Sequence, residues 1–231
     1  VKIGIPEPKS NEIRVKVVAS GLCSTDLHIR DGRMNLGKLP RIPGHETAGI
    51  IDAVGDGVEK NWIGQRVTVA IDIPCGKCRH CLSGHTNRCQ ALTRIGFERD
   101  GGHADYVVVP EENLIPLPDA LSFEAASILP DAVACMYHCL MEQGNLRATD
   151  KVLILGAGGL GIHGIQIAKF AGAVVVATSR NPARRKIAEE YGAIAANPND
   201  SHFNGSMNEI TQDEGFDIVA DCVGTQASIR Q

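Results

Sequence analysis

The chain has 231 residues, of which 43% are hydrophobic and 22% are charged, and its formal net charge is −4 with an isoelectric point near 6.1. This composition predicts a globular protein of one or two domains, and without a basic run it favours small-molecule chemistry over binding to nucleic acid or a membrane surface. Neither a signal peptide nor an apolar stretch of about 18 residues is visible, so we expect a cytoplasmic protein.

The first half of the chain is predicted to be rich in β-strands. Alternating hydrophobic residues mark EIRVKVVAS from residue 12, GIIDAV from 49, RVTVAI from 66 and ADYVVVP from 104, with Gly and Pro in the turns between them. Short strands at this spacing predict a compact barrel or sandwich, which we assign to residues 1–125.

The second half changes to alternating helix and strand patterns. A helical pattern over 122–142 is followed by strand candidates at 151–156, 173–179, 193–197 and 216–224 and by helix candidates at 162–172, 182–193 and 206–214. The fold class is therefore α/β, and residues 126–231 are predicted to form an interdomain helix and half of a doubly wound nucleotide domain. Because the chain begins with Val1 instead of methionine and stops just after an apolar strand, we expect both ends to be truncated. The complete fold has six strands, so we expect a chain ending at Gln231 to be weakly active or inactive.

A glycine-rich turn indicates a dinucleotide site. The segment LGAGGLG places Gly156, Gly158 and Gly161 in G-x-G-x-x-G spacing, with Gly159 between them, after an apolar strand and at the start of a helix. Glycines permit a tight turn and close approach of a pyrophosphate to the helix N-terminus. The alternative is a glycine-rich loop with a purely structural role.

The end of the next strand predicts which dinucleotide is preferred. An acidic residue there would bind the ribose 2′-hydroxyl of NAD, but the chain has Ser179 and Arg180. Because an arginine suits a 2′-phosphate, we expect NADP to be preferred over NAD. The alternative is a solvated Arg180 and binding of either cofactor.

A cluster of cysteines predicts a structural metal site in the segment 74–89, called here the cysteine lobe. Cys75, Cys78, Cys81 and Cys89 have the spacing C-x2-C-x2-C-x7-C, and four thiolates can enclose one zinc ion. An iron–sulfur cluster is the alternative metal group. His80 and His85 lie in the same segment and are interpreted as solvated loop residues.

Two further motifs, GLCSTDLH at 21–28 and PGHETAG at 43–49, precede the cysteine lobe and the glycine turn, so the chain contains four motifs in a fixed order. In order with the cysteine lobe and the glycine turn, they resemble the zinc-containing medium-chain alcohol dehydrogenase family, from about residue 12 to residue 224. The resemblance implies a GroES-like catalytic domain, a Rossmann-type nucleotide domain, and a catalytic zinc in the cleft between them.

The resemblance also implies roles for individual residues. Cys23 and His45 would bind the catalytic zinc, and Glu46 would be the nearby carboxylate that approaches the metal during ligand exchange. Asp26 would orient the ring of His45. Thr25 would accept the alcohol proton and His28 would pass it to solvent. Ser24 stands where many family members have a basic residue, so a contact from this position to the cofactor is not expected.

The third zinc ligand is assigned within LPDAVACMYHC. Asp131, Cys135, His138 and Cys139 would share one face of a regular helix, so spacing alone leaves all four as candidates. In the family the ligand precedes a tyrosine by six residues, which selects Asp131 from the position of Tyr137. Cys135 and Cys139 are then expected to be buried thiols.

Four other histidines match no ligand position and are expected to be structural or exposed: His103, His138, His163 and His202. Asp221 is interpreted as either a nicotinamide contact or a packing residue.

The function implied is a zinc-dependent, NAD(P)-linked alcohol dehydrogenase with two zinc ions per chain, one catalytic and one structural. A polyol or sugar dehydrogenase of the same family is an alternative, and a non-catalytic, zinc- and nucleotide-binding redox sensor is another. The expected partner is a small alcohol or carbonyl compound, and the full-length protein is expected to form a homodimer or homotetramer.

Overall fold

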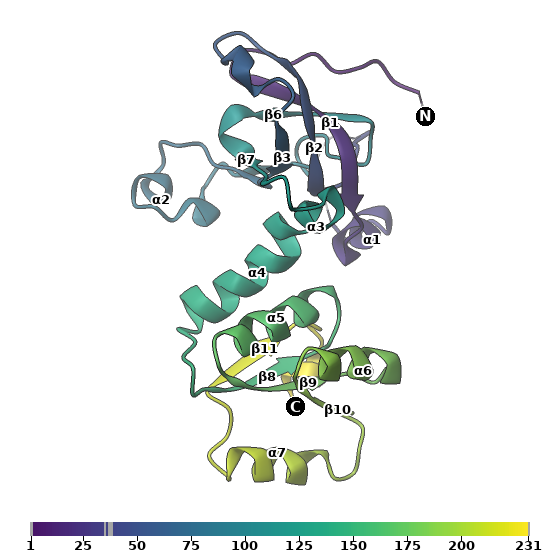
Figure 1. The fold of residues 1–231 in the computed structure, drawn as a ribbon, viewed down its shortest axis with the longest axis vertical. Helices are drawn as coiled ribbons and strands as arrows, with labels where there is room; N and C mark the ends of the chain where they lie inside the picture. The colour runs from purple at the N-terminus through teal and green to yellow at the C-terminus, as the bar shows by residue number, and fades with distance from the viewer. Residues whose placement is uncertain (1, 35, 37–38, 231) are drawn as a thin grey trace. The chain divides into compact units, whose positions relative to one another are not determined.

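The computed structural model describes residues 2–34, 36 and 39–230, and the chain divides into two compact units, Val1–Asp131 and Ala132–Gln231 (Figure 1). The predicted domain boundary between residues 125 and 126 rests on the change from strand to helix patterns, whereas this division rests on compactness. The units are described separately below.

The first unit is built on a five-stranded antiparallel sheet with the strand order β6-β1-β2-β3-β7. Its strands are β1 (Glu12–Gly21), β2 (Glu46–Val54), β3 (Arg66–Val69), β6 (Tyr106–Pro110) and β7 (Leu114–Pro116). Alternate residues such as Ile13 and Val15 are completely buried and pack with Ile51, Val67 and Val109. The period of two in the sequence therefore corresponds to one side of a sheet packed on a core.

Three short strands of this unit were not predicted. β4 (Asp72–Ile73) pairs with β5 (Thr93–Arg94), and this small ribbon and helix α2 (Arg79–Leu82) frame the cysteine lobe. β7 pairs with β3. Strands of two or three residues are too short to produce a recognisable alternation of hydrophobic residues, so no sequence pattern predicted them.

Helix α1 (Ser24–Arg30) begins at Cys23, which is its N-cap residue. The Asp26 side chain accepts a hydrogen bond from the backbone N–H of Cys23 at 2.9 Å, so it closes the first turn as in a capping box. Helix α3 (Phe123–Ser127) is capped by the Ser122 hydroxyl, which accepts from the N–H of Ala125. These caps fix where the two helices begin.

The helical segment after α3 is not a regular α-helix. A π-helical turn (Leu129–Val133) precedes α4 (Ala134–Tyr137), and a second π-helical stretch (His138–Gln143) follows it. A π-helix has more residues per turn than the period of 3.6 on which the shared face was predicted. The regular helix on which the shared face of Asp131, Cys135, His138 and Cys139 depended is therefore not formed over this segment.

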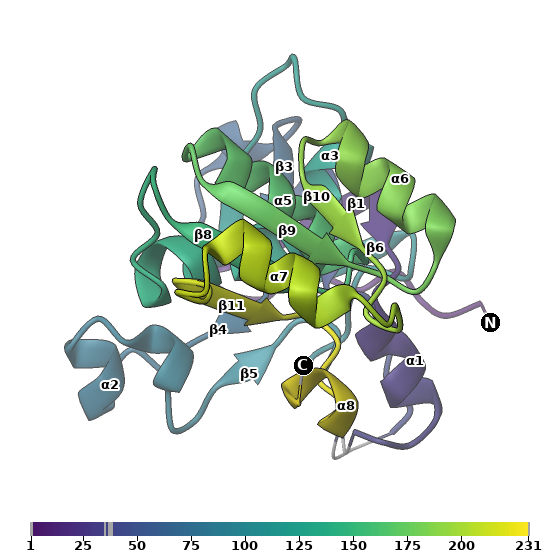
Figure 2. The same cartoon turned by 90° about the horizontal axis from the view of Figure 1, so that it is seen from below.

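The second unit contains a four-stranded parallel sheet with the order β10-β9-β8-β11. Its elements are β8 (Lys151–Leu155), α5 (Gly159–Phe170), β9 (Val174–Thr178), α6 (Pro182–Glu190), β10 (Ile194–Ala196), α7 (Phe203–Thr211), β11 (Ile218–Asp221) and α8 (Gln226–Ile229). One face of the sheet packs against α5 and α6 and the other against α7 (Figures 1 and 2). The predicted α/β class is confirmed, and this order is the one expected for half of a doubly wound fold.

The helix predicted over 206–214 lies slightly earlier in the chain, at Phe203–Thr211. Gln212 and Asp213 have positive φ angles of 56° and 61°, which an α-helix cannot continue through. The left-handed backbone at Gln212 ends the helix, and the polar run QDE offered no pattern from which to predict this.

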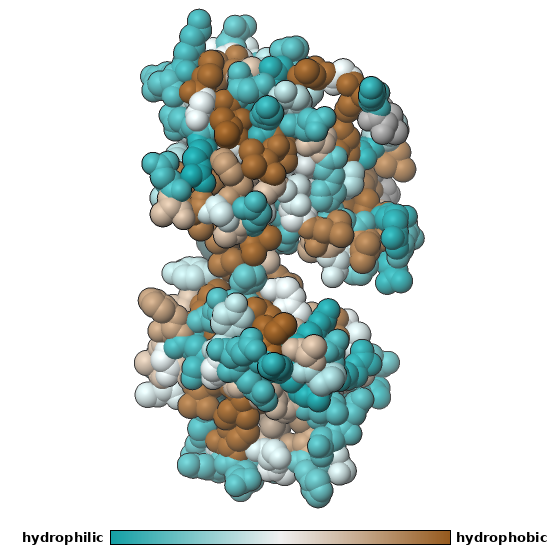
Figure 3. Space-filling model, turned by 45° about the vertical axis from the view of Figure 1, so that its right-hand side comes forward, coloured by the Kyte–Doolittle hydropathy of each residue, from teal (hydrophilic) through white to brown (hydrophobic). Residues whose placement is uncertain are grey.

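Hydrophobic side chains reach the surface of both units in separate groups on the face that Figure 3 shows. The most exposed large one is Phe170 at the end of α5, with 96% of its surface accessible. Within the described residues, no helix is long and apolar enough to cross a membrane.

Candidate metal and nucleotide sites

Four predicted site residues meet in the first unit and form what we call the mixed cluster: Cys23, His45, Glu46 and Asp131. One potential ligand atom of each lies within 4.8 Å of those of the other three. Cys23 stands at the N-cap of α1, His45 and Glu46 at the start of β2, and Asp131 in the π-helical turn. Residues far apart in the sequence are therefore brought to one point by three different elements.

The spacing of these atoms suits a single metal ion. Asp131 Oδ2 lies 3.4 Å from His45 Nε2 and 3.6 Å from Cys23 Sγ. Zinc bonds of about 2.0–2.3 Å in a tetrahedron would place two donors roughly 3.3–3.8 Å apart. The donor set and its spacing therefore fit zinc.

The electrostatics of the mixed cluster also favour a cation. Burial lowers the pKa of His45, but the side-chain hydrogen bonds to Asp131 and Cys23 and the charges of Asp131 and Asp26 outweigh burial and raise this pKa to about 10. Burial and the charge of Asp131 raise the pKa of Glu46 to about 7, while the hydrogen bond with His45 lowers the pKa of Asp131. Several acidic groups thus surround one imidazole, and a positive ion among them relieves their repulsion.

Asp26 lies behind the His45 ring, as the resemblance implied. Its Oδ1 is 3.7 Å from His45 Nδ1, and neither atom has a hydrogen-bond partner in the described part of the chain although both are buried. The ring nitrogen on the opposite side, Nε2, is the one that approaches Asp131. This arrangement leaves Nε2 as the metal-facing nitrogen.

Thr25 and His28 follow Cys23 on α1. Thr25 Oγ1 lies 3.5 Å from Cys23 Sγ, and His28 is exposed one turn further along the helix. Ser24 is exposed as well. A half-buried hydroxyl and a solvent-exposed imidazole at i and i+3 lie on the same side of a helix, which a proton relay requires.

The sequence analysis missed the loop 96–103, which covers the start of β2. The ring of Phe97 lies 5.0 Å from that of His45, and His103 Nε2 lies 3.5 Å from Asp26 Oδ2. His103 was expected only to be structural or exposed, and it is half-buried. The density of glycines, at 96, 101 and 102, was the available signal, because it indicates close approach of two backbones.

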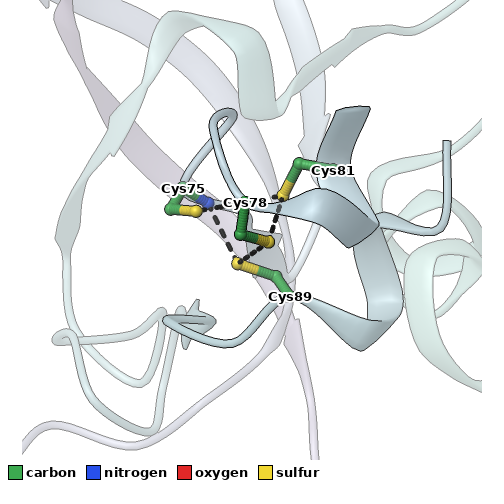
Figure 4. A group of neighbouring side chains, drawn as sticks. All are labelled: Cys75, Cys78, Cys81 and Cys89. Atoms are coloured by element: carbon green, nitrogen blue, oxygen red, sulfur yellow. Dashed lines mark hydrogen bonds between the residues drawn. The ribbon is translucent and has the colours of Figure 1, made fainter. Parts of the chain in front are cut away.

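The cysteine lobe brings its four sulfurs together as the spacing predicted, and Figure 4 shows them facing a common centre. The Sγ of Cys78 lies 3.5 Å from that of Cys81 and 4.0 Å from that of Cys89, and Cys75 and Cys81 are 4.0 Å apart. These separations bracket the roughly 3.8 Å expected for two thiolates on one zinc ion, and none of the four forms a disulfide.

Backbone groups prepare the cysteine lobe for negative charge. Backbone N–H groups of Gln90 and Cys81 lower the pKa of Cys78 to about 6, whereas burial and the neighbouring thiols raise that of Cys81 to about 12. The N–H groups of Cys75 and Ala91 donate to Cys89 Sγ. His85 is exposed as expected, whereas His80 is half-buried within α2.

The glycine turn has the geometry that a phosphate-binding turn needs. Gly156 has a φ of +97°, and its N–H donates to the carbonyl oxygen of Thr178. A Cβ on Gly161 would lie 1.9 Å from the carbonyl oxygen of Gly156, so only glycine fits there. Gly158 is the N-cap of α5 and Gly159 its first residue. The turn is therefore dictated by its backbone and opens onto the helix N-terminus.

A cavity of about 540 Å³ lies beside this turn in the second unit. Ser179 and Arg180 line it together with Arg184, which the sequence analysis missed. Among the described residues, its lining includes no acidic side chain. The Arg185 guanidinium donates to the carbonyl oxygens of Ser179 and Arg180 and holds this corner in place. The cavity thus carries positive charge at the end of β9.

Several remaining predictions can be compared with the structure. Cys135 is exposed, so its expected burial is wrong, whereas Cys139 packs against the core of the second unit. Asp221 Oδ1 accepts hydrogen bonds from the N–H groups of Val223 and Gly224 and its Oδ2 accepts from Ser228, which is a turn-stabilising role. The remaining histidines lie outside both metal clusters: His138, His163 and His202.

Comparisons with known proteins match both units. Residues 9–119 match the family described as "Alcohol dehydrogenase GroES-like domain", and residues 159–231 match "Zinc-binding dehydrogenase". The chain is 36% identical to an L-threonine 3-dehydrogenase of Chromobacterium violaceum over 99% of this chain and 68% of that protein.

Solved structures are similar over the same span. An NAD-dependent alcohol dehydrogenase is 33% identical with a TM-score of 0.91, covering 97% of this chain and 66% of that one. A putative zinc-binding dehydrogenase of Sinorhizobium meliloti, bound to NADP, is 34% identical with a TM-score of 0.89, covering 98% and 67%. This chain spans about two thirds of the length of each of these proteins.

Proposed function

Because the chain belongs to the zinc-containing medium-chain alcohol dehydrogenase family, we propose that it is part of a zinc-dependent enzyme that transfers a hydride between an alcohol and NAD(P). The observation that carries this proposal is the mixed cluster, in which Cys23, His45, Glu46 and Asp131 converge within 4.8 Å. The cysteine lobe alone would suffice for a structural zinc. A second, chemically different cluster is what a catalytic metal requires.

The residues of the mixed cluster have separate roles in this proposal. Cys23, His45 and Asp131 would hold the zinc, which when bound supplies the Lewis acidity that lets an alcohol oxygen lose its proton near neutral pH. Glu46 is the additional carboxylate, which would approach the metal during ligand exchange. Asp26 holds the His45 ring from behind.

The proton leaves through α1. Thr25 Oγ1, beside Cys23, accepts the proton from the alcohol, and His28 on the same side of the helix delivers it to solvent. The dimer or tetramer expected for the full-length protein stays a prediction.

The nucleotide cavity supports NADP as the preferred cofactor. The pyrophosphate would lie on the N-terminus of α5, and Arg180 and Arg184 would face the 2′-phosphate with the Ser179 hydroxyl. No described lining residue offers the carboxylate that would bind an unmodified ribose. A negative 2′-phosphate is the group that these arginines suit best.

The function is tested on the full-length protein with a panel of L-threonine, simple alcohols, polyols and sugars, read by the absorbance of the reduced cofactor. We expect turnover of at least one alcohol class with two zinc ions per chain. A protein that binds two zinc ions and NADP but turns over no member of the panel would instead be the non-catalytic sensor.

The cofactor preference is tested by replacing Arg180 with alanine. The expected result is a KM for NADP raised about tenfold or more with a much smaller change for NAD, because a charge-assisted hydrogen bond is lost. Lys186→Ala is the matched control, since Lys186 is exposed on α6 outside the cavity. Equal KM values for NADP and NAD in the parent protein would contradict the preference.

A further inference from the structure

We propose that His103 is a positioning residue for the mixed cluster: through Asp26 it fixes the orientation and tautomer of the His45 ring. The inference rests on the proposed function, because it concerns the metal that His45 would bind. His103 lies on loop 96–103, far from His45 in the sequence and outside every motif that identified the site.

Three polar contacts connect Ser20, through His103 and Asp26, to His45 within the first unit. Ser20 Oγ lies 2.9 Å from His103 Nδ1, and His103 Nε2 lies 3.5 Å from Asp26 Oδ2. Asp26 Oδ1 in turn lies 3.7 Å from His45 Nδ1. Ser20, His103, Asp26 and His45 are therefore neighbours in a row of polar side chains that ends at His45 Nε2, the nitrogen that approaches Asp131.

The atoms at the joints of this row have no other partners. His103 Nε2, Asp26 Oδ1 and His45 Nδ1 are all buried without a hydrogen-bond partner in the described ranges. Asp26 and His45 side chains are only 5% and 3% exposed. Buried polar atoms of this kind carry a desolvation cost unless they pair with one another, and a small closing of the two gaps satisfies all three.

The direction of the hydrogen bonds determines the tautomers. When the Ser20 hydroxyl donates to His103 Nδ1, the ring carries its proton on Nε2 and donates it to Asp26 Oδ2. Oδ2 already accepts the N–H of Cys23, so Oδ1 is left to accept from His45 Nδ1. His45 then presents the lone pair of Nε2 to the metal, as a neutral imidazole ligand must.

The backbone holds His103 at this position with little freedom. The N–H of His103 donates to the carbonyl oxygen of Pro43, and the N–H of Gly102 donates to that of Gly44. A Cβ on Gly44 would lie 2.5 Å from the backbone nitrogen of His103 and 2.8 Å from its Cγ and Nδ1. The residue before His45 is therefore glycine because the His103 ring lies against it.

A packing role and a hydrogen-bonding role predict different variants to be harmful. His103→Phe keeps an aromatic ring but removes the donor, whereas His103→Gln removes the ring but offers an amide N–H near the place of Nε2. A positioning role through Asp26 predicts that Phe disturbs the metal site and Gln restores it. A packing role predicts the reverse.

The experiment measures zinc release from the full-length holoenzyme to a chromophoric chelator. We expect His103→Phe to weaken the binding of one zinc ion by about 10-fold or more, the effect typical of residues that orient a metal ligand, while His103→Gln stays within about 2-fold of the parent. The zinc of the cysteine lobe serves as an internal control, and His202→Phe, at an exposed histidine, is the matched variant.

Asp26→Asn tests whether the effect passes through Asp26. In that background His103→Phe should cause little further change, because the two residues act in series. Full additivity would overturn the proposal, as would a His103→Phe variant that binds both zinc ions like the parent or equal weakening by Phe and Gln. If the Phe variant does not fold, Ser20→Ala takes its place, and unchanged zinc release from it would also overturn the proposal.

Cys23→Ala separates this proposal from the proposed function. If Cys23→Ala still binds two zinc ions, the assignment of the mixed cluster to a metal fails and the proposed function fails with it. If Cys23→Ala loses one zinc ion while His103→Phe behaves like the parent, only the role of His103 fails.

Discussion

The two metal-type clusters of the first unit differ in how much of the fold each one needs. All four donors of the cysteine lobe come from residues 75–89, framed by α2 and a two-stranded ribbon. The mixed cluster collects its donors from Cys23 to Asp131, at the N-cap of α1, the start of β2 and a π-helical turn. The first can be recognised from spacing alone, and the second exists only once the sheet has formed.

The clusters also differ in chemistry. Four equivalent thiolates satisfy a tetrahedral ion completely and leave no position for a substrate. The mixed cluster has one sulfur, one imidazole and two carboxylates, and because three of these donors suffice to hold a catalytic zinc, the carboxylate of Glu46 can move away without removing the other three. The contrast teaches that the donors of the fully coordinated site, the cysteine lobe, come from one short segment. The donors of the mixed cluster, which leaves a position for a substrate, are brought together by the tertiary structure.

Removing a thiolate of the cysteine lobe is expected to have the largest effect on stability. Cys78→Ala should release one zinc ion and lower the free energy of unfolding by several kcal/mol, because binding of a structural zinc contributes directly to folding. Thermal unfolding with zinc analysis of the full-length protein checks this. A Cys78→Ala protein with an unchanged Tm would remove the distinction between the two clusters.

The reciprocal change is expected to affect activity rather than folding. Cys23→Ala should lower kcat/KM by about three orders of magnitude, which corresponds to about 4 kcal/mol of transition-state stabilisation, with the lobe zinc retained. Its Tm should stay close to that of the parent. Steady-state kinetics and zinc analysis test this, and a variant that loses both zinc ions would show that the clusters are not independent.

Exchanging one donor makes the mixed cluster resemble the cysteine lobe. Asp131→Cys keeps the formal charge of the donor set but adds a soft thiolate, so the catalytic zinc should exchange about tenfold more slowly. Asp131→Asn, which removes the charge, should exchange it faster. Exchange of zinc against a labelled isotope ranks the three proteins, and the same rate in all three would show that Asp131 is not a ligand.

The smallest expected effect concerns the ion pair between Arg94 and Glu98, which lies in the chain segment between the cysteine lobe and the end of loop 96–103. Arg94 follows the cysteine lobe and pairs with Glu98 of loop 96–103 at 2.7 Å, and this hydrogen bond lowers the pKa of Glu98 below its usual 4.5. A lowered pKa stabilises the fold above the unfolded-state value, and the contribution is lost as pH falls from about 4.5 through the folded-state pKa.

Glu98→Gln should therefore destabilise the protein by at most about 1 kcal/mol at pH 7 and by less at pH 4. Urea unfolding of parent and variant at both pH values measures the difference, and Glu112→Gln is the control, since Glu112 has no ion pair among the described residues. A difference that grows as the pH falls would contradict the sign of the pKa shift.

Local patterns predicted the elements that depend on local chemistry. The spacing of Cys75 to Cys89 and the glycines from Gly156 to Gly161 each require only a short stretch of backbone, and the α/β class followed from the alternation of periods. The strands with a clear alternation, such as β1, were found nearly to the residue.

The sequence was less informative where the backbone departs from a regular period. The π-helical turn around Asp131 depends on its hydrogen-bond pattern, which hydropathy does not record, so the regular helix assumed for this segment was wrong, although the structure does bring Asp131 to Cys23 and His45. His103 gave no signal because its partners, Ser20 and Asp26, lie some eighty residues earlier in the chain. The contacts of His103 with Ser20 and Asp26 depend on how β1 pairs with β2 and β6, which a local sequence pattern does not record.

The glycines around His45 have a consequence for large-scale mutagenesis. A Cβ on Gly96 or Gly101 would lie within 2.8 Å of the backbone of Gly44, and one on Gly102 would lie 1.9 Å from the Thr47 hydroxyl. In a scan of every single substitution, these positions would be as intolerant as the metal ligands, although they have no side chain to react. A map of mutational tolerance would therefore include these glycines in the active site. Separate measurements of folded protein and of turnover would distinguish them from the residues that bind the metal.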